Sequence, residues 1–356
     1  MEEIKLSVLD IEKKYTIDIE EAEYGGSDRN IVQWGKNNDA PVLYKNCYKN
    51  SATLKSVIDG SVNYVIGDSI EVNAEYWAKE VNRRGMSMRA FVAHLAMNYF
   101  VYGGFAFQVI FNKLGCPVEL YALDFGRCRT NKANSKVWYN NKWSKYGTKA
   151  EEFDAYGQKF DINHPTQIYY FKGDFTSSVY PLPPYFGAIN DVLTEVECSK
   201  YSLNSISNGL MAKYVLNFPE NNNLTDEQKE GLEDAIRNKF CGSEAPANFL
   251  MYWGDGTNRL EVSKIEGDET PERFVAIRDA ARQNIFISFR ATPLLFGLPN
   301  ASNGFSTNEY RDSAKLFEKL VIDPVRDSIK EAIDKVTGVE NAISIVPMTI
   351  SFDTED

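Results

Sequence analysis

The stretch from Pro293 to Gly338 most constrains the fold, because it joins an irregular loop to the longest helical pattern in the sequence. Its start is rich in prolines, glycines and asparagines, a composition that disfavours regular structure. These residues are Pro293, Gly297, Pro299, Asn300, Asn303 and Gly304. The loop also carries more apolar side chains than a solvated linker needs, namely Leu294, Leu295, Phe296, Leu298 and Phe305. Two interpretations stay open: an ordinary core helix behind a surface loop, or a mechanical rather than catalytic arrangement.

The helical part of this stretch has a clear start and a clear end. Ser306 followed by Glu309 matches a capping box, in which a hydroxyl and a carboxylate satisfy amide groups of the first turn. Apolar residues then recur at helical spacing: Phe317, Leu320, Val321, Val325, Ile329, Ile333 and Val336. Gly338 is suited to the position just after the helix. Pro324 removes one backbone hydrogen bond inside the helix, so we expect a kink near residues 321–323.

Composition narrows the classes of protein. The chain has 356 residues, which is enough for two or three substructures. Its net charge of −11 argues against tight, charge-driven binding of nucleic acid, although an acidic surface that lets DNA pass without sticking stays compatible. Five scattered cysteines and two histidines argue against a zinc site, a disulfide framework or a histidine-rich metal centre, and fit a reducing compartment. We expect no cofactor, no bound metal, no signal peptide and no membrane span.

The first half of the chain mixes helices and strands. Cap residues and apolar spacing predict helices over residues 51–66 and 87–102. Strands are expected over residues 105–111, 117–124 and 166–175. The sequence KVWYNNKWSKY predicts a tight hairpin that turns at Asn140 and Asn141.

The second half alternates long helices with a small insert. A proline-rich break at residues 181–184 precedes a helix expected to extend to Met211. A strand, a capped helix and two more strands then form a compact module over residues 212–266. Another helix is expected from Pro271 to Arg290, directly before the loop described first. The fold class is therefore α+β.

Four phrases in this order resemble the phage portal proteins of tailed double-stranded DNA viruses. They are VYGGFAFQVIFN with PVELYALD, VYPLPPYFGAI, ISNGLMAKYVLNF, and RDAARQNIFISFRATPLLFGLPNASNGFSTNE. The resemblance extends over roughly residues 50–337. It implies a portal-like fold with a β-rich wing and N-terminal arm over 1–182, a first stem helix over 183–211, and a clip over 212–266. A second stem helix over 267–291, a tunnel loop over 292–307, and a long kinked wing helix with a C-terminal strand over 308–356 complete it. The sequence after Gly338 leaves no room for the helical crown that many portals carry.

The resemblance also implies a function without catalysis. A portal forms a dodecameric ring at one capsid vertex of the virion, is assembled in the host cytoplasm, and serves as the channel for DNA packaging and ejection. Its partners would be further copies of itself, the terminase large subunit, a head-completion or adaptor protein, the major capsid protein, and double-stranded DNA passing without sequence specificity. No membrane is involved.

The site residues follow from the same resemblance. The tunnel loop would present Leu298, Asn300, Ser302, Asn303, Gly304 and Phe305 to DNA, and no Lys or Arg lies between Thr292 and Asn308. Such a loop can touch a duplex without the affinity that release of counterions adds. In the second stem helix, Arg278 and Arg282 are one turn apart. They are expected to face either the channel or acidic residues of the other stem helix or the next subunit, such as Asp191 or Glu195.

Three other classes of protein are alternatives. Another ring-forming head–tail connector or minor capsid protein is the first alternative, and residues 212–266 discriminate, because those proteins usually lack a clip insert between long helices. A non-viral soluble enzyme is the second. The sequence contains no GxxxxGK[ST], GxSxG or HExxH motif to support it. The third is a soluble scaffold unrelated to viruses, which would have no evident reason to carry an apolar, proline-bearing loop before a kinked helix.

Overall fold

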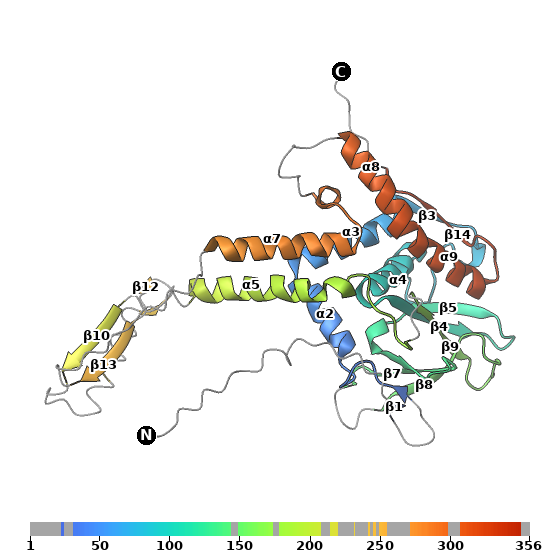
Figure 1. The fold of residues 1–356 in the computed structure, drawn as a ribbon. Coiled ribbons are helices and arrows are strands. Elements are labelled where there is room, and N and C mark those ends of the chain that lie inside the picture. Colours follow the sequence, from blue (N-terminus) through green and yellow to red (C-terminus); the bar gives the residue numbers. More distant parts are fainter. Residues whose placement is uncertain are drawn as a thin grey trace. The chain divides into compact units, whose positions relative to one another are not determined.

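The computed structural model describes residues 23–24, 31–143, 149–173, 178–207, 214–219, 231, 241–242, 245–246, 249–254, 271–297 and 307–349. The chain forms two compact units (Figure 1). Unit 1 comes from residues 1–192 and 282–356, and unit 2 comes from residues 193–281. Within the described residues no helix is long and apolar enough to cross a membrane.

A six-stranded sheet is the main β structure of unit 1. Its strand order is β5-β4-β9-β8-β7-β6, and all neighbours are antiparallel except β8 and β9. The strands are β4 (Gly104–Phe111), β5 (Pro117–Ala122), β6 (Cys128–Thr130), β7 (Lys136–Tyr139), β8 (Glu151–Ala155) and β9 (Thr166–Lys172). Aromatic rings face one another across β4 and β9, with Phe105 stacked on Phe171 at 4.6 Å and Phe107 on Tyr169 at 4.9 Å. Such cross-strand pairs fix the register of the central strands.

Helix α4 (Met88–Tyr102) is the centre of the core of unit 1. It begins at Ser87, whose hydroxyl accepts from the N–H of Ala90, and it ends at Gly103 in the left-handed conformation. Figure 1 shows α4 beside β4 and β5, where Phe91 packs edge-on against Phe107 at 5.3 Å. Because most of its side chains are buried, α4 is covered on more than one face.

Two further helices pack beside α4. Helix α3 (Ala52–Ile66) is capped by the hydroxyl of Ser51 and ends at Gly67, as the sequence predicts. Helix α2 (Ala40–Asn50) precedes it and contacts both α3 and α4. Sequence reasoning did not identify α2. Further short elements of unit 1 are β1 (Glu23–Tyr24), β2 (Ile31–Val32), η1 (Glu75–Trp77), η2 (Phe125–Arg127) and η3 (Phe186–Ala188).

The predicted tight hairpin at Asn140 and Asn141 is wrong. Strand β7 pairs with β6 and with β8, and Tyr139 lies opposite Glu151, so its next partner begins well beyond a two-residue turn. The N–H of Asn140 donates instead to the carbonyl of Arg127. The sequence of β8, EEFDA, carries two exposed glutamates that mask its strand character, and this strand was not predicted.

Two long helices lie on either side of the small insert in the sequence. Helix α5 (Ile189–Ser207) begins five residues later than predicted, after the 3-10 turn η3, and α7 (Pro271–Ser288) begins at the predicted proline. The helices lie side by side (Figure 1): in unit 2 the ring of Tyr201 stacks on that of Phe274 at 4.8 Å. In unit 1 the amide of Asn284 donates to the carboxylate of Asp191 at 2.8 Å.

Between these helices unit 2 contains two small sheets. Strand β10 (Tyr214–Pro219) pairs in parallel with β13 (Phe249–Gly254), and β11 (Cys241–Gly242) pairs antiparallel with β12 (Ala245–Pro246). Parallel neighbours need a crossover connection, which agrees with the strand–helix–strand order predicted for this module. The second of the two strands predicted at the end of this module, over residues 260–265, lies outside the described residues. Of the capped helix predicted within the module, the structure describes Gly231, which is helical.

The predicted C-terminal helix is continuous but not α-helical throughout. It consists of α8 (Thr307–Phe317), a π-helical segment η5 (Glu318–Ile322) and α9 (Asp323–Thr337), and it ends at Gly338 in the left-handed conformation. Pro324 lies in the first turn of α9. A proline at this point removes one N–H and crowds the carbonyl four residues earlier, and the wider π turn directly before it relieves that conflict. Strand β14 (Ile343–Val346) then pairs antiparallel with β3 (Ser69–Val72).

Candidate functional site

The six residues expected to face DNA from the tunnel loop lie outside the described residues. They are Leu298, Asn300, Ser302, Asn303, Gly304 and Phe305. The chain on both sides of them is described, however. The 3-10 turn η4 (Pro293–Phe296) precedes the segment 298–306, and α8 follows it. The candidate site is therefore described by the contacts that hold η4 and α8 in unit 1.

The turn η4 is fixed by apolar packing. Leu294 and Leu295 are buried. The ring of Phe296 lies 5.9 Å from that of Phe286 in α7 and 5.9 Å from that of Phe317 in α8. The sequence places these apolar residues in a loop, and the structure gives the reason for their number: they anchor the loop to the core.

Gly60, in the middle of α3, makes room for this anchor. A Cβ atom at this position would lie 2.6 Å from the ring of Phe296, which is closer than real side-chain contacts allow. A glycine inside a helix weakens it, so its presence signals a close approach. That signal is visible in the sequence, but the sequence does not tell which residue approaches.

The chain that follows the loop is tied to the same helix. The hydroxyls of Tyr310 in α8 and Tyr64 in α3 are 3.1 Å apart, and the rings of Tyr64 and Phe317 meet edge to face at 5.5 Å. Burial, and next the hydrogen bond to Tyr310, raise the pKa of Tyr64 above its usual range. The Tyr64 phenol is therefore neutral at physiological pH. Both ends of the segment 298–306 are thus anchored on α3, one turn apart.

A buried arginine connects α3 to the π-helical segment. Arg326 in α9 is 5% exposed, and its guanidinium donates to the carbonyls of Tyr64 and Val65 at the end of α3. It also donates to the carboxylates of Glu318 at 2.7 Å and Asp323 at 3.4 Å. One side chain therefore satisfies the terminal carbonyls of one helix, the carboxylate at the start of η5 and the carboxylate directly after η5.

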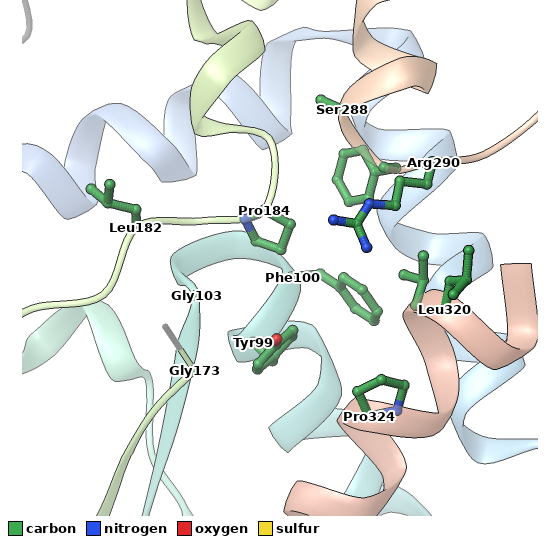
Figure 2. Close-up of a pocket in the computed structure, with 12 residues that line it drawn as sticks. Tyr99, Phe100, Gly103, Gly173, Leu182, Pro184, Ser288, Arg290, Leu320 and Pro324 are labelled. Atoms are coloured by element: carbon green, nitrogen blue, oxygen red, sulfur yellow. The ribbon is translucent and has the colours of Figure 1, made fainter. Parts of the chain in front are cut away.

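A pocket of about 290 Å³ opens in unit 1 beside η5 (Figure 2). It lies between α4, the end of α7 and the start of α9. Its lining consists of Tyr99, Phe100, Gly103, Gly173, Leu182, Pro184, Ser288, Phe289, Arg290, Leu320, Val321 and Pro324. Apolar side chains dominate this lining, and Arg290 is the charged residue among them.

The two arginines predicted on the second stem helix are both on α7. Among the described residues, the buried Nε atom of Arg278 has no hydrogen-bond partner, and a carboxylate oxygen of Asp279 lies 3.9 Å from it. Arg282 is half-buried and makes contacts of its own. Of the acidic partners considered from the sequence, Asp191 accepts a hydrogen bond from Asn284, and Glu195 is buried. That Arg278 or Arg282 faces DNA stays a proposal.

Comparison with known proteins identifies the family. The sequence model of the family described as "Phage portal protein" matches residues 75–356. The chain belongs to the phage portal protein family. No curated protein sequence matches it.

Solved structures share the portal chain's fold at low sequence identity. A chain from the virion of a native gene transfer agent particle is 16% identical and has a TM-score of 0.55, with 87% of this chain and 83% of that chain covered. A chain from the neck of an empty particle is 15% identical, with a TM-score of 0.56 and coverage of 89% and 85%. A third, from the neck of a native particle computed with C12 symmetry, is also 15% identical, with a TM-score of 0.54 and coverage of 86% and 83%.

Membership of the portal family decides between the classes weighed from the sequence. Portal proteins are structural and not enzymatic, so the expectation of a non-catalytic protein is confirmed. What sequence reasoning missed is the set of residues that hold the segment 298–306 and η5 in place. Gly60, Tyr64, Tyr310 and Arg326 come from distant parts of the chain, and only the glycine and the arginine leave a local signal.

Proposed function

We propose that this chain forms a dodecameric ring at one vertex of a virion capsid, with a central channel for DNA packaging and ejection. The family match over residues 75–356 carries the proposal. Added support comes from the shared fold with a chain whose structure was computed with C12 symmetry in the neck of a particle. The ring is assembled in the host cytoplasm before DNA is packaged.

Within this ring the elements take the portal roles. Residues 1–182 form the wing, α5 and α7 form the stem within 183–211 and 267–291, and residues 212–266 form the clip. The side-by-side packing of α5 and α7 and the parallel pair β10–β13 between them support this division. Residues 292–307 form the tunnel loop, and residues 308–356 form the kinked wing helix, bent at Pro324, and the C-terminal strand.

The tunnel loop meets DNA without binding it tightly. Its segment 298–306 contains no charged residue, so contact with phosphates releases no counterions and the duplex is free to slide. The anchoring of both loop ends on α3 supports a loop whose base is held in a defined place. Arg278 and Arg282 on α7 face either the channel or the next subunit.

The clip and wing bind other proteins of the particle. The terminase large subunit, which supplies the motor for packaging, docks on the clip, and a head-completion or adaptor protein replaces it later. The major capsid protein surrounds the wing. These partners follow from the portal role and not from a particular surface of the chain.

Negative-stain electron microscopy with light scattering tests the ring. We expect particles with a central channel and a mass of about twelve subunits, since closed cyclic assemblies are the usual form of such homo-oligomers. The same preparation is then incubated with capsid proteins of its own particle. A chain that stays monomeric at high concentration, and in the presence of those proteins, would contradict the proposal.

A further inference from the structure

Arg290 has a backbone conformation that is unfavourable for its side chain. It follows the end of α7 with φ +52°, in the left-handed region. The N–H of Ala291 donates to the carbonyl of Phe286, which closes the helix end in the way usually found with glycine at this position. Among the described residues, the other non-glycine positions with positive φ are all asparagines, namely Asn38, Asn134 and Asn341. Asparagine tolerates this region because its short amide bonds locally, and arginine does not.

The side chain of Arg290 lies in the pocket beside η5. Figure 2 shows its guanidinium turned into the middle of the pocket, between Pro184 and Leu320 and above the ring of Phe100. Among the described residues, no carboxylate forms an ion pair with it. Arg290 is itself exposed, so its guanidinium is accessible to an anionic group that comes from outside the chain. An unfavourable backbone that aims such a cation inward is typical of a functional position.

We propose that this pocket is one half of an intersubunit site, in which Arg290 binds a carboxylate side chain of a second copy of this chain. The inference rests on the proposed ring, which places copies side by side. The chain carries 50 acidic against 39 basic residues, so a second copy has an excess of carboxylates that could pair with this cation. The pocket, of about 290 Å³, has room for a side chain and not for a DNA duplex, so its size favours a side chain as the occupant. A single acidic side chain with its apolar stem fits the hollow and its lining.

The first test separates assembly from folding. In Arg290→Gly the strained backbone is relieved and the cation is lost. We expect the free subunit to unfold at the same temperature as the wild type or a higher one, while the concentration needed for assembly, measured by mass photometry, rises at least tenfold. Arg290→Lys keeps the charge, so the concentration that it needs for assembly should lie between that of the wild type and that of Arg290→Gly.

Asn341→Gly is the matched control. It relieves the same backbone region, and the hydrogen bonds of Asn341 use its backbone atoms, so its assembly should equal that of the wild type. If Arg290→Gly assembles like this control, the proposal is wrong and the ring stands. If Arg290→Gly unfolds at a lower temperature, the side chain serves its own subunit and the proposal is also wrong. A wild type that never assembles overturns both proposals.

The second test identifies the carboxylate. The amine introduced by Arg290→Lys is joined to a carboxylate in contact with it by a zero-length carbodiimide, and the product is mapped by mass spectrometry. We expect a cross-link between two subunits, seen as a dimer on a denaturing gel. The rival within the chain is Asp174, which follows the pocket residue Gly173 in the sequence. A cross-link from position 290 to Asp174 of the same chain, with no dimer, would overturn the proposal.

Discussion

At the scale of the residue, Arg326 makes the sharpest prediction. Its guanidinium bonds two carbonyls of α3 and two carboxylates beside η5, and its side chain is 7% exposed. Breaking a buried ion pair typically costs about 3–5 kcal/mol. Because Glu318 and Asp323 are 26% and 32% exposed and can regain water, we expect Arg326→Met to lower the free energy of unfolding by about 2–4 kcal/mol. Urea unfolding followed by circular dichroism measures the change.

Arg83→Met provides the control for this prediction. Arg83 also pairs with a carboxylate, that of Glu119 at 2.7 Å, but its side chain is 75% exposed. Surface pairs of this kind contribute little, so the control should unfold like the wild type. If both variants lose the same free energy of unfolding, then the burial of Arg326 does not make its ion pairs more stabilising than a surface pair.

The sequence contains a signal for Arg326 that periodicity alone does not interpret. The buried side chains of η5 and α9 include Ile322, Ile329 and Ile333, and residue 326 lies four after the first and three before the second. It therefore occupies the apolar face of the helix. An arginine there must find acceptors, but the carbonyls that it reaches are those of residues 64 and 65. No local pattern connects such distant positions, so the partners were not predictable.

At the scale of the element, the contact between α3 and η4 is testable. Replacing a helical glycine by alanine normally stabilises a helix by roughly 1 kcal/mol. At Gly60 the added methyl would overlap the ring of Phe296, and forcing extra atoms into a packed site costs about 1–3 kcal/mol. We therefore expect Gly60→Ala to lower the free energy of unfolding. In the Phe296→Leu background the smaller side chain should remove most of the destabilisation that Gly60→Ala causes. A double-mutant cycle on the free energy of unfolding measures this difference.

Gly187→Ala is the matched control for the contact. A Cβ at Gly187 would meet nothing within 4 Å, so the substitution should leave stability unchanged or slightly higher. If Gly60→Ala behaves in the same way, then Phe296 does not hold the loop against α3. The anchoring of the segment 298–306 would then depend on the tyrosine pair alone.

The elements themselves were predictable where their ends carry chemical signals. Ser51, Ser87 and Gly338 each mark a helix boundary that the structure confirms, because capping depends on residues next to one another in the sequence. Pairing of strands depends on distant residues instead. The hairpin at Asn140 was predicted wrongly for this reason: the turn residues favour a reversal, but the partner of β7 starts at Glu151.

At the scale of the whole molecule, the order of the elements along the chain was predictable from the sequence, but the way they pack against one another was not. Helix, small α/β module, helix, loop and long helix can be predicted from the sequence in that order, and the described helices and strands follow it. The convergence of η4, α8 and α9 on α3 joins residues near 60 to residues near 300 and 326. Such contacts follow from tertiary packing, which one sequence does not encode in any local pattern.

The channel role of the loop is testable through its length and its side chains. Both ends of the segment 298–306 are anchored by contacts that do not involve it, so deleting residues 300–304 should leave rings intact. DNA packaging or retention should be lost, because the groups that touch the duplex are gone. A second variant replaces residues 300–304 by glycines and serines of equal number, which keeps the span and removes the side chains. Rings are counted by electron microscopy, and packaged DNA is measured by protection from nuclease.

The two variants together separate geometry from contact. If both assemble and neither packages DNA, the side chains of residues 300–304 act on the duplex. If only the deletion fails, the span of the loop matters and the side chains do not. Normal packaging in the deletion would contradict a channel role for the loop. The lack of charge in the loop leads to a further expectation: lysines introduced at positions 300 and 303 should slow the passage of DNA. Added salt should restore the passage, because contacts with phosphates release counterions and weaken as the salt concentration rises.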